Sequence, residues 1–291
     1  MTPFENPDHD AMNPHEQFYY ATSMIGLLDN DETRFFGSCF FVANVSDRRI
    51  LDAGNGAVMF LVTARHVVAE PLHRGVTLFV RVNRHGAAPE TMPLPSDGWQ
   101  FAEDGADIAV LPMPELRYER VAGGFAVPPI SYQQFMISDW RNSAYDYRFG
   151  DVVRITGLWY GSTKHPQLIV RSGNIATATV GPVQFESGML PAYLVDASVT
   201  RGMSGGPVYA THGRGWAETA LLGVNYGYWP VNLDELDAAP PGGQTDGAGD
   251  AAMRQLMSRV ERLNSRLAIV TPVHHLGEVL SRHPSWGRPL L

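Results

Sequence analysis

Residues 195–209 read V-D-A-S-V-T-R-G-M-S-G-G-P-V-Y, and this stretch decides how the rest of the chain is interpreted. Ser204 lies between Gly202 and the pair Gly205-Gly206, and glycine tolerates a positive φ and the close approach of another backbone. A serine in such a turn can expose its hydroxyl beside backbone N–H groups that converge on one point. That geometry traps the oxyanion formed when a hydroxyl attacks a carbonyl. The alternative is a glycine-rich hairpin with an incidental serine, so the rest of the sequence has to decide.

A nucleophilic serine needs a base to accept its proton and a carboxylate to orient that base. Residues 61–69 read L-V-T-A-R-H-V-V-A, an apolar run that breaks at His66. Residues 106–112 read A-D-I-A-V-L-P and place Asp107 directly before an apolar, strand-like run. Asp104 is the rival acid, but its polar turn lacks a strand that would bury and orient a carboxylate. We therefore predict His66 as the base and Asp107 as the residue that orients it.

The three segments together resemble the trypsin/chymotrypsin-like serine proteases, which carry histidine, aspartate and serine in this order. Bacterial peptidases of the HtrA/Deg-like branch are the most similar. G-S-C-F-F-V at residues 37–42 is similar to their opening strand, and V-D-A at residues 195–197 to the segment before their serine. Residues 267–273 and the helical pattern after them are similar to their closing strand and helix. The resemblance implies an all-β fold of two six-stranded Greek-key β-barrels with a C-terminal helix, and Ser204 as the nucleophile.

The resemblance also implies roles for residues around the nucleophile. The backbone N–H groups of Gly202 and Ser204 would form the oxyanion hole. Ser198, six residues before the nucleophile, would face the primary specificity pocket. Because Ser198 is small and neutral, we expect a small or medium apolar residue before the scissile bond. Met203 stands where trypsins have an aspartate, which argues against their mode of zymogen activation. The strand that would bind the substrate carries Asn225, Tyr226 and Gly227.

The succession of strand-like runs and turns predicts two barrels. Residues 1–15 are polar and rich in Pro and Asn, and we expect a flexible N-terminal arm there. The expected ranges are 16–125 for the first barrel, 126–150 for the connection between the barrels and 151–291 for the second barrel. Within the first barrel, the pattern predicts a strand over residues 17–28, a single helical turn over residues 67–70 and a Pro-rich connection over residues 89–95.

Residues 228–266 depart from the family pattern and are interpreted as an insertion. Low-complexity sequence over residues 237–250 is followed by apolar residues at helical spacing. This helix either packs on the barrel or forms a lid or a partner-binding element. The closing segment 274–282 is predicted to be helical, with His274-His275 as a surface pair and not a metal site, because no second carboxylate or cysteine spacing supports one. Only residues 283–291 follow, so no PDZ domain is expected.

Composition limits the remaining classes. The chain is 44% hydrophobic with 29 Gly and 21 Pro, which is typical of a globular, turn-rich protein. A net charge of −8 without a basic stripe disfavours nucleic-acid and anionic-membrane partners. The single cysteine, Cys39, excludes an intramolecular disulfide. No signal peptide and no apolar run near the roughly 18 residues of a membrane span are visible, so we expect a cytoplasmic, prokaryotic protein.

The sequence thus predicts a serine endopeptidase that cleaves a protein or peptide substrate through an acyl-enzyme, without metal or cofactor. The alternative is a catalytically silent binding or scaffold protein that keeps the fold. A third reading is a protease held inactive until a regulatory partner engages the insertion at residues 228–266.

Overall fold

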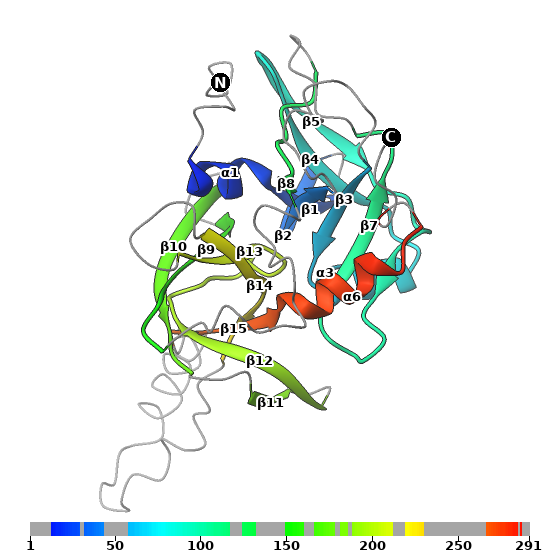
Figure 1. Cartoon of the computed structure of the whole chain (residues 1–291). Coiled ribbons are helices and arrows are strands. Elements are labelled where there is room, and N and C mark those ends of the chain that lie inside the picture. Colours follow the sequence, from blue (N-terminus) through cyan, green and yellow to red (C-terminus); the bar gives the residue numbers. More distant parts are fainter. Residues whose placement is uncertain are drawn as a thin grey trace, which may run out of the picture.

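The computed structural model describes residues 13–29, 32–43, 58–116, 124–131, 149–159, 166–177, 181–185, 188–211, 219–229, 266–284 and 286. Most of these residues lie in strands that form two sheets side by side, with three short helices against them (Figure 1). The predicted connection over residues 126–150 and the insertion over residues 228–266 lie mostly outside the described residues. The predicted domain boundaries therefore stay predictions.

The first sheet contains eight strands in the order β5-β4-β1-β2-β3-β7-β6, with β8 parallel to β2. Its core lies on β2 and β3, where runs of apolar residues are buried on both faces. The strands are β1 (Thr22–Asp29), β2 (Glu32–Ala43), β3 (Met59–Thr63), β4 (Leu78–Arg84), β5 (Ala87–Pro93), β6 (Gln100–Phe101), β7 (Ala109–Met113) and β8 (Ile130–Ser131).

The second sheet closes on itself. Its order is β10-β9-β13-β14-β15-β12-β11, and a further pairing of β10 with β12 joins six of these strands into a barrel. The strands are β9 (Val152–Trp159), β10 (Gln167–Ile175), β11 (Gly181–Phe185), β12 (Gly188–Asp196), β13 (Pro207–Thr211), β14 (Thr219–Tyr228) and β15 (Leu267–Pro272). The predicted all-β, double-barrel fold class is confirmed, although the first sheet has eight strands where six were predicted.

The N-terminal helix α1 (Pro14–Ala21) corrects the prediction of a strand over residues 17–28, which is strand only from Thr22. The helix begins where Asn13 accepts a hydrogen bond from the Glu16 N–H and the Glu16 carboxylate accepts one from the Asn13 N–H. Such a capping box satisfies two otherwise unpaired N–H groups. The helix also overlaps the end of the predicted arm, whose residues 1–12 lie outside the described residues.

Two proline-containing segments also differ from prediction. Helix α3 (Arg65–His73) runs through Pro71, where a single turn was predicted, because Val67 and Val68 bury its inner face in the core. Strand β5 occupies most of the predicted connection over residues 89–95 and pairs with β4 at the end of the sheet. Proline is tolerated on an edge strand because no further strand needs its missing N–H.

Aromatic and helical packing joins the two barrels. The rings of Phe18 in α1 and Tyr209 in β13 stack with centroids 4.1 Å apart, and both side chains are fully buried. The C-terminal helix α6 (Val273–Ser281), which was predicted over residues 274–282, leaves β15 and packs against the first sheet (Figure 1). The interface between the barrels is therefore a buried, apolar core, and the site lies beside it.

Candidate active site

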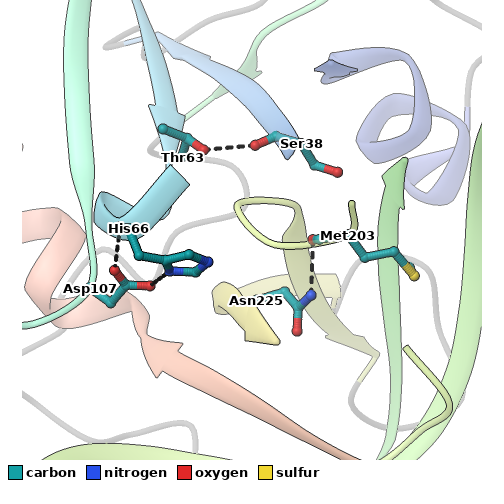
Figure 2. Close-up of polar contacts among 6 residues, drawn as sticks. All are labelled: Ser38, Thr63, His66, Asp107, Met203 and Asn225. Atoms are coloured by element: carbon teal, nitrogen blue, oxygen red, sulfur yellow. Dashed lines mark hydrogen bonds and ion pairs between the residues drawn. The ribbon is translucent and has the colours of Figure 1, made fainter. Parts of the chain in front are cut away.

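His66 is placed by the junction of β3 and α3. The strand ends at Thr63, the helix begins at Arg65, and the buried Val67 and Val68 anchor its first turn. The His66 backbone N–H donates to Asp107 Oδ1 at 2.8 Å, and His66 Nδ1 lies 2.7 Å from Asp107 Oδ2 (Figure 2). One carboxylate thus fixes both the backbone and the ring of the histidine.

Asp107 is buried, with a side chain only 7% exposed, whereas the His66 side chain is 43% exposed. An ionised carboxylate accepts hydrogen bonds and cannot donate them, so the hydrogen bond places the imidazole proton on Nδ1. Nε2 is then left with a lone pair on the exposed side of the ring. The rival Asp104 instead accepts a hydrogen bond from the Ala106 N–H and lies beside His275, away from His66.

Ser204 lies in a turn that only glycine can build. Gly202 and Gly205 have φ values of +92° and +86°. A Cβ on Gly205 would lie 2.1 Å from the Ser38 carbonyl oxygen, and one on Gly206 would lie 2.0 Å from the Thr156 carbonyl oxygen. The turn is therefore wedged between β2 of the first sheet and β9 of the second.

Backbone hydrogen bonds fix the shape of this turn. Gly205 N–H donates to Asn225 O at 2.8 Å, and Met203 N–H donates to Thr200 O at 3.1 Å. Within the described part of the chain, the N–H groups of Gly202 and Ser204 donate to no protein acceptor. These are the two N–H groups predicted for the oxyanion hole, and they are available to a ligand.

His66 and Ser204 line the same cleft, which has a volume of about 810 Å³. No hydrogen bond joins them among the residues that the structure describes. Catalytic hydrogen bonds are often long in structures without substrate and shorten only in the complex. The cleft is lined by Leu27, Asp29, Arg34, Phe36, His66, Val67, Glu70, Pro71, Thr200, Arg201, Gly202, Ser204, Tyr226, Gly227 and Tyr228.

Two of the three predicted residues on the substrate strand line the cleft. The Tyr226 ring lies 4.9 Å from the His66 ring, and a Cβ on Gly227 would lie 3.7 Å from Ser204 Oγ. Asn225 does not reach the cleft: it is fully buried and donates from Nδ2 to Met203 O at 2.9 Å (Figure 2). Strand β14 bulges at this point, because Asn225 pairs with Val270 and Gly227 with Ile269, so that Asn225 holds the turn while Tyr226 and Gly227 line the cleft.

The specificity residue predicted at Ser198 is exposed to solvent and is not among the residues that line the cleft. Its predicted role stays a prediction. Thr200 and Arg201 contribute to the wall beside Ser204 instead. The β1–β2 hairpin supplies another wall with Asp29 and Arg34, which no local sequence motif pointed to, because the hairpin reaches the site only through folding.

His275 is not a surface residue, which corrects the prediction for the His274-His275 pair. Its side chain is 5% exposed, and its Nδ1 lies 2.6 Å from Asp104 Oδ2 without the geometry of a hydrogen bond. Glu278 completes a group of three side chains whose ligand atoms lie within 4.8 Å of one another. This group could hold a metal ion, although no second carboxylate or cysteine spacing in the sequence suggested one.

Comparison with known proteins assigns the family. The model of the trypsin-like peptidase domain matches residues 37–216, more than half of the chain, and the chain belongs to this family. No curated protein matches it. No helix within the described ranges has the length and apolar character needed to cross a membrane.

Solved structures with a similar fold include HtrA-type and other proteases of low identity. The HtrA-type protease AlgW with a decapeptide is 16% identical with a TM-score of 0.49, over 90% of this chain and 64% of that one. This chain thus spans less than two thirds of the AlgW chain. The MamO protease domain of Magnetospirillum magneticum is 15% identical with a TM-score of 0.49, over 91% and 97% of the chains. The inactive form of the Rv3671c protease of M. tuberculosis is 16% identical with a TM-score of 0.46, over 97% of both chains.

Proposed function

We propose that this trypsin-like peptidase is a serine endopeptidase with His66, Asp107 and Ser204 as its catalytic triad. The observation that carries the proposal is the His66–Asp107 pair at 2.7 Å beside a cleft that also contains Ser204. A buried carboxylate that holds an exposed imidazole has a direct chemical use. It presents the unprotonated Nε2 to a nucleophile and stabilises the imidazolium that forms after proton transfer.

The reaction follows from this arrangement. Ser204 Oγ attacks the peptide carbonyl carbon while its proton passes to His66 Nε2. The carbonyl oxygen becomes an oxyanion, which accepts hydrogen bonds from the Gly202 and Ser204 N–H groups. The imidazolium then gives its proton to the leaving amine, and the C–N bond breaks to leave an acyl-enzyme. A water molecule, deprotonated by His66, hydrolyses the ester and restores Ser204.

Reaction with a fluorophosphonate probe tests the proposal directly. Purified protein should gain the mass of one probe molecule, and Ser204→Ala should abolish the gain. Asp107→Asn should slow labelling by about 10⁴-fold, because the triad loses the acceptor that sets the histidine tautomer. Asp104→Asn is the matched control and should label at the wild-type rate, because Asp104 contacts His275 and not His66. Equal rates for the two aspartate variants would contradict the assignment.

A catalytically silent or partner-activated protein is the second candidate. It is favoured by the lack of a His66–Ser204 hydrogen bond among the described residues and by the Tyr226 ring lying against His66. If folded protein remains unlabelled, this candidate replaces the first. Labelling should then be repeated with cell extract and with a variant lacking residues 231–265, which make up most of the predicted insertion at residues 228–266. The cytoplasmic location stays a prediction that cell fractionation would check.

A further inference from the structure

Ser38 in β2 connects the first barrel to the turn at residues 202–206. We call this turn, which carries the proposed nucleophile Ser204, the nucleophile turn. Ser38 is fully buried and lies between the His66 segment and the turn of Met203 (Figure 2). Its backbone N–H donates to Ser204 O at 2.8 Å, and its carbonyl accepts from Thr63 Oγ1 at 2.7 Å. Thr63 ends the strand that leads to His66. Ser38 thus connects the segment of the base to the residue that carries the nucleophile.

The Ser38 hydroxyl makes a second pair of contacts. It donates to Gly202 O at 2.6 Å and accepts from the Leu158 N–H at 2.8 Å. Its proton and one of its lone pairs are therefore used by two backbone groups from the second barrel. Loss of the hydroxyl would leave a buried carbonyl and a buried N–H without a partner, which is costly inside a protein.

The space around the hydroxyl is closed. A Cβ on Gly157 would lie only 2.9 Å from Ser38 Oγ, and one on Gly205 would lie 2.1 Å from Ser38 O. Because both positions are glycine, their backbones approach Ser38 more closely than the backbone of a residue with a Cβ could. Such packing leaves little room for a water molecule that could take over the two hydrogen bonds.

The Gly202–Met203 peptide is the group that the hydroxyl orients. Ser38 Oγ holds its carbonyl, and Thr200 O accepts a hydrogen bond from its N–H. Both ends of this peptide plane are therefore held by hydrogen bonds. The Gly202 N–H is joined to the plane through the Gly202 Cα, where φ is +92°, a value that glycine adopts far more readily than other residues. The direction of one predicted oxyanion donor therefore depends on the Ser38 hydroxyl.

We propose that Ser38 is a positioning residue whose hydroxyl sets the oxyanion hole by holding the Gly202 carbonyl. Ser38 is fully buried and is not among the residues that line the cleft. The inference rests on the proposed serine-protease function, because the oxyanion hole acts on the intermediate of that reaction. It goes beyond that proposal by assigning catalytic consequences to a buried side chain on the other barrel.

The test compares Ser38→Ala with Thr22→Val. Thr22 is a buried β1 residue whose hydroxyl donates to Phe18 O at 2.6 Å, away from the nucleophile turn, and its loss controls for general destabilisation. Fluorophosphonate labelling of folded Ser38→Ala should slow by about 10- to 100-fold, a part of the 10²–10³-fold effect of deleting an oxyanion donor. With a cleavable peptide, kcat should fall by the same factor at every pH, with KM changed less than twofold.

Hydrogen exchange over residues 199–206 gives a readout that needs no activity. Exchange there should rise in Ser38→Ala and not in Thr22→Val. If Ser38→Ala does not fold, Ser38→Cys, with a weaker and larger donor, should likewise slow labelling and raise exchange relative to Thr22→Val. Labelling and exchange equal to those of Thr22→Val would overturn the proposal. Unlabelled wild-type protein would instead refute the proposed function, and the exchange measurement would still decide whether Ser38 holds the turn.

Discussion

At the scale of single residues, the turn around Ser204 is limited by space as much as by φ. Gly205 and Gly86 both have positive φ, at +86° and +63°, but only Gly205 has backbone within 3 Å of the position of a Cβ. Gly205→Ala should therefore lower the free energy of unfolding by about 3 kcal/mol or more and abolish labelling of Ser204. Gly86→Ala should cost only about 1–2 kcal/mol, the price of the left-handed conformation. Urea unfolding of both variants makes the comparison.

Equal destabilisation by the two alanines would contradict this account. It would mean that the nucleophile turn can move away from Ser38 and Thr63 to admit a methyl group, and that the close contacts of Gly205 do not hold it in place.

The chemical residues of the candidate site were readable from sequence because each lies in a short local signature. His66 follows an apolar run, Asp107 precedes one, and Ser204 lies among glycines. Ser38 lies in a strand that the sequence predicted, but the hydrogen bonds of its hydroxyl to β9 and to the turn form only in the folded chain. The inward direction of Asn225 was missed for a similar reason. The bulge between Asn225 and Gly227 arises from the pairing of β14 with β15, which no local sequence pattern shows.

At the scale of elements, local sequence signals determine some helices and strands, and tertiary packing determines others. The Asn13–Glu16 capping box was present in the sequence, yet the aromatic residues after it favoured a strand prediction. In α3, the burial of Val68 outweighed the helix-breaking tendency of Pro71. The edge position of β5 made its prolines acceptable, and edge position cannot be read before the strand order is known.

Helix α6 predicts a pH dependence of stability. Burial, and then the neighbouring His275, lower the pKa of His274 to about 4, with Asp104 opposing them. The unfolded chain, with a histidine pKa near 6.5, then binds more protons than the folded one between about pH 4 and 6.5. Stability should therefore fall as the pH is lowered from 6.5 towards 4. His274→Gln should weaken this dependence in urea titrations at pH 7, 6 and 5.

The matched control is His73→Gln, which removes an exposed histidine from the end of α3. His275 and Asp104 both influence the pKa of His274, so each variant must be compared with wild type at the same pH. Parallel curves for His274→Gln and wild type would show that His274 titrates alike in the folded and unfolded chains.

At the scale of the whole molecule, the sequence predicted the class of fold but not the contacts that join the two barrels. Three ordered motifs are enough to imply two barrels. The contacts that join those barrels come from positions without a signature: Phe18 against Tyr209, α6 against the first sheet, and Ser38 against the nucleophile turn. Each depends on segments far apart in sequence, so none could be derived from spacing.

This joining predicts that the site and the core unfold together, and Cys39 can report it. Cys39 is the only cysteine, is fully buried next to Ser38 on β2, and burial raises the pKa of its thiol. Thiolate is the reactive form, so a disulfide reagent such as DTNB should modify none of the native protein and one thiol per unfolded chain. In a urea series, the midpoint of Cys39 modification should coincide with the midpoint for loss of Ser204 labelling. Labelling lost at clearly lower urea would show that the barrels separate before the first one opens, and that the contacts between them are weaker than their burial implies.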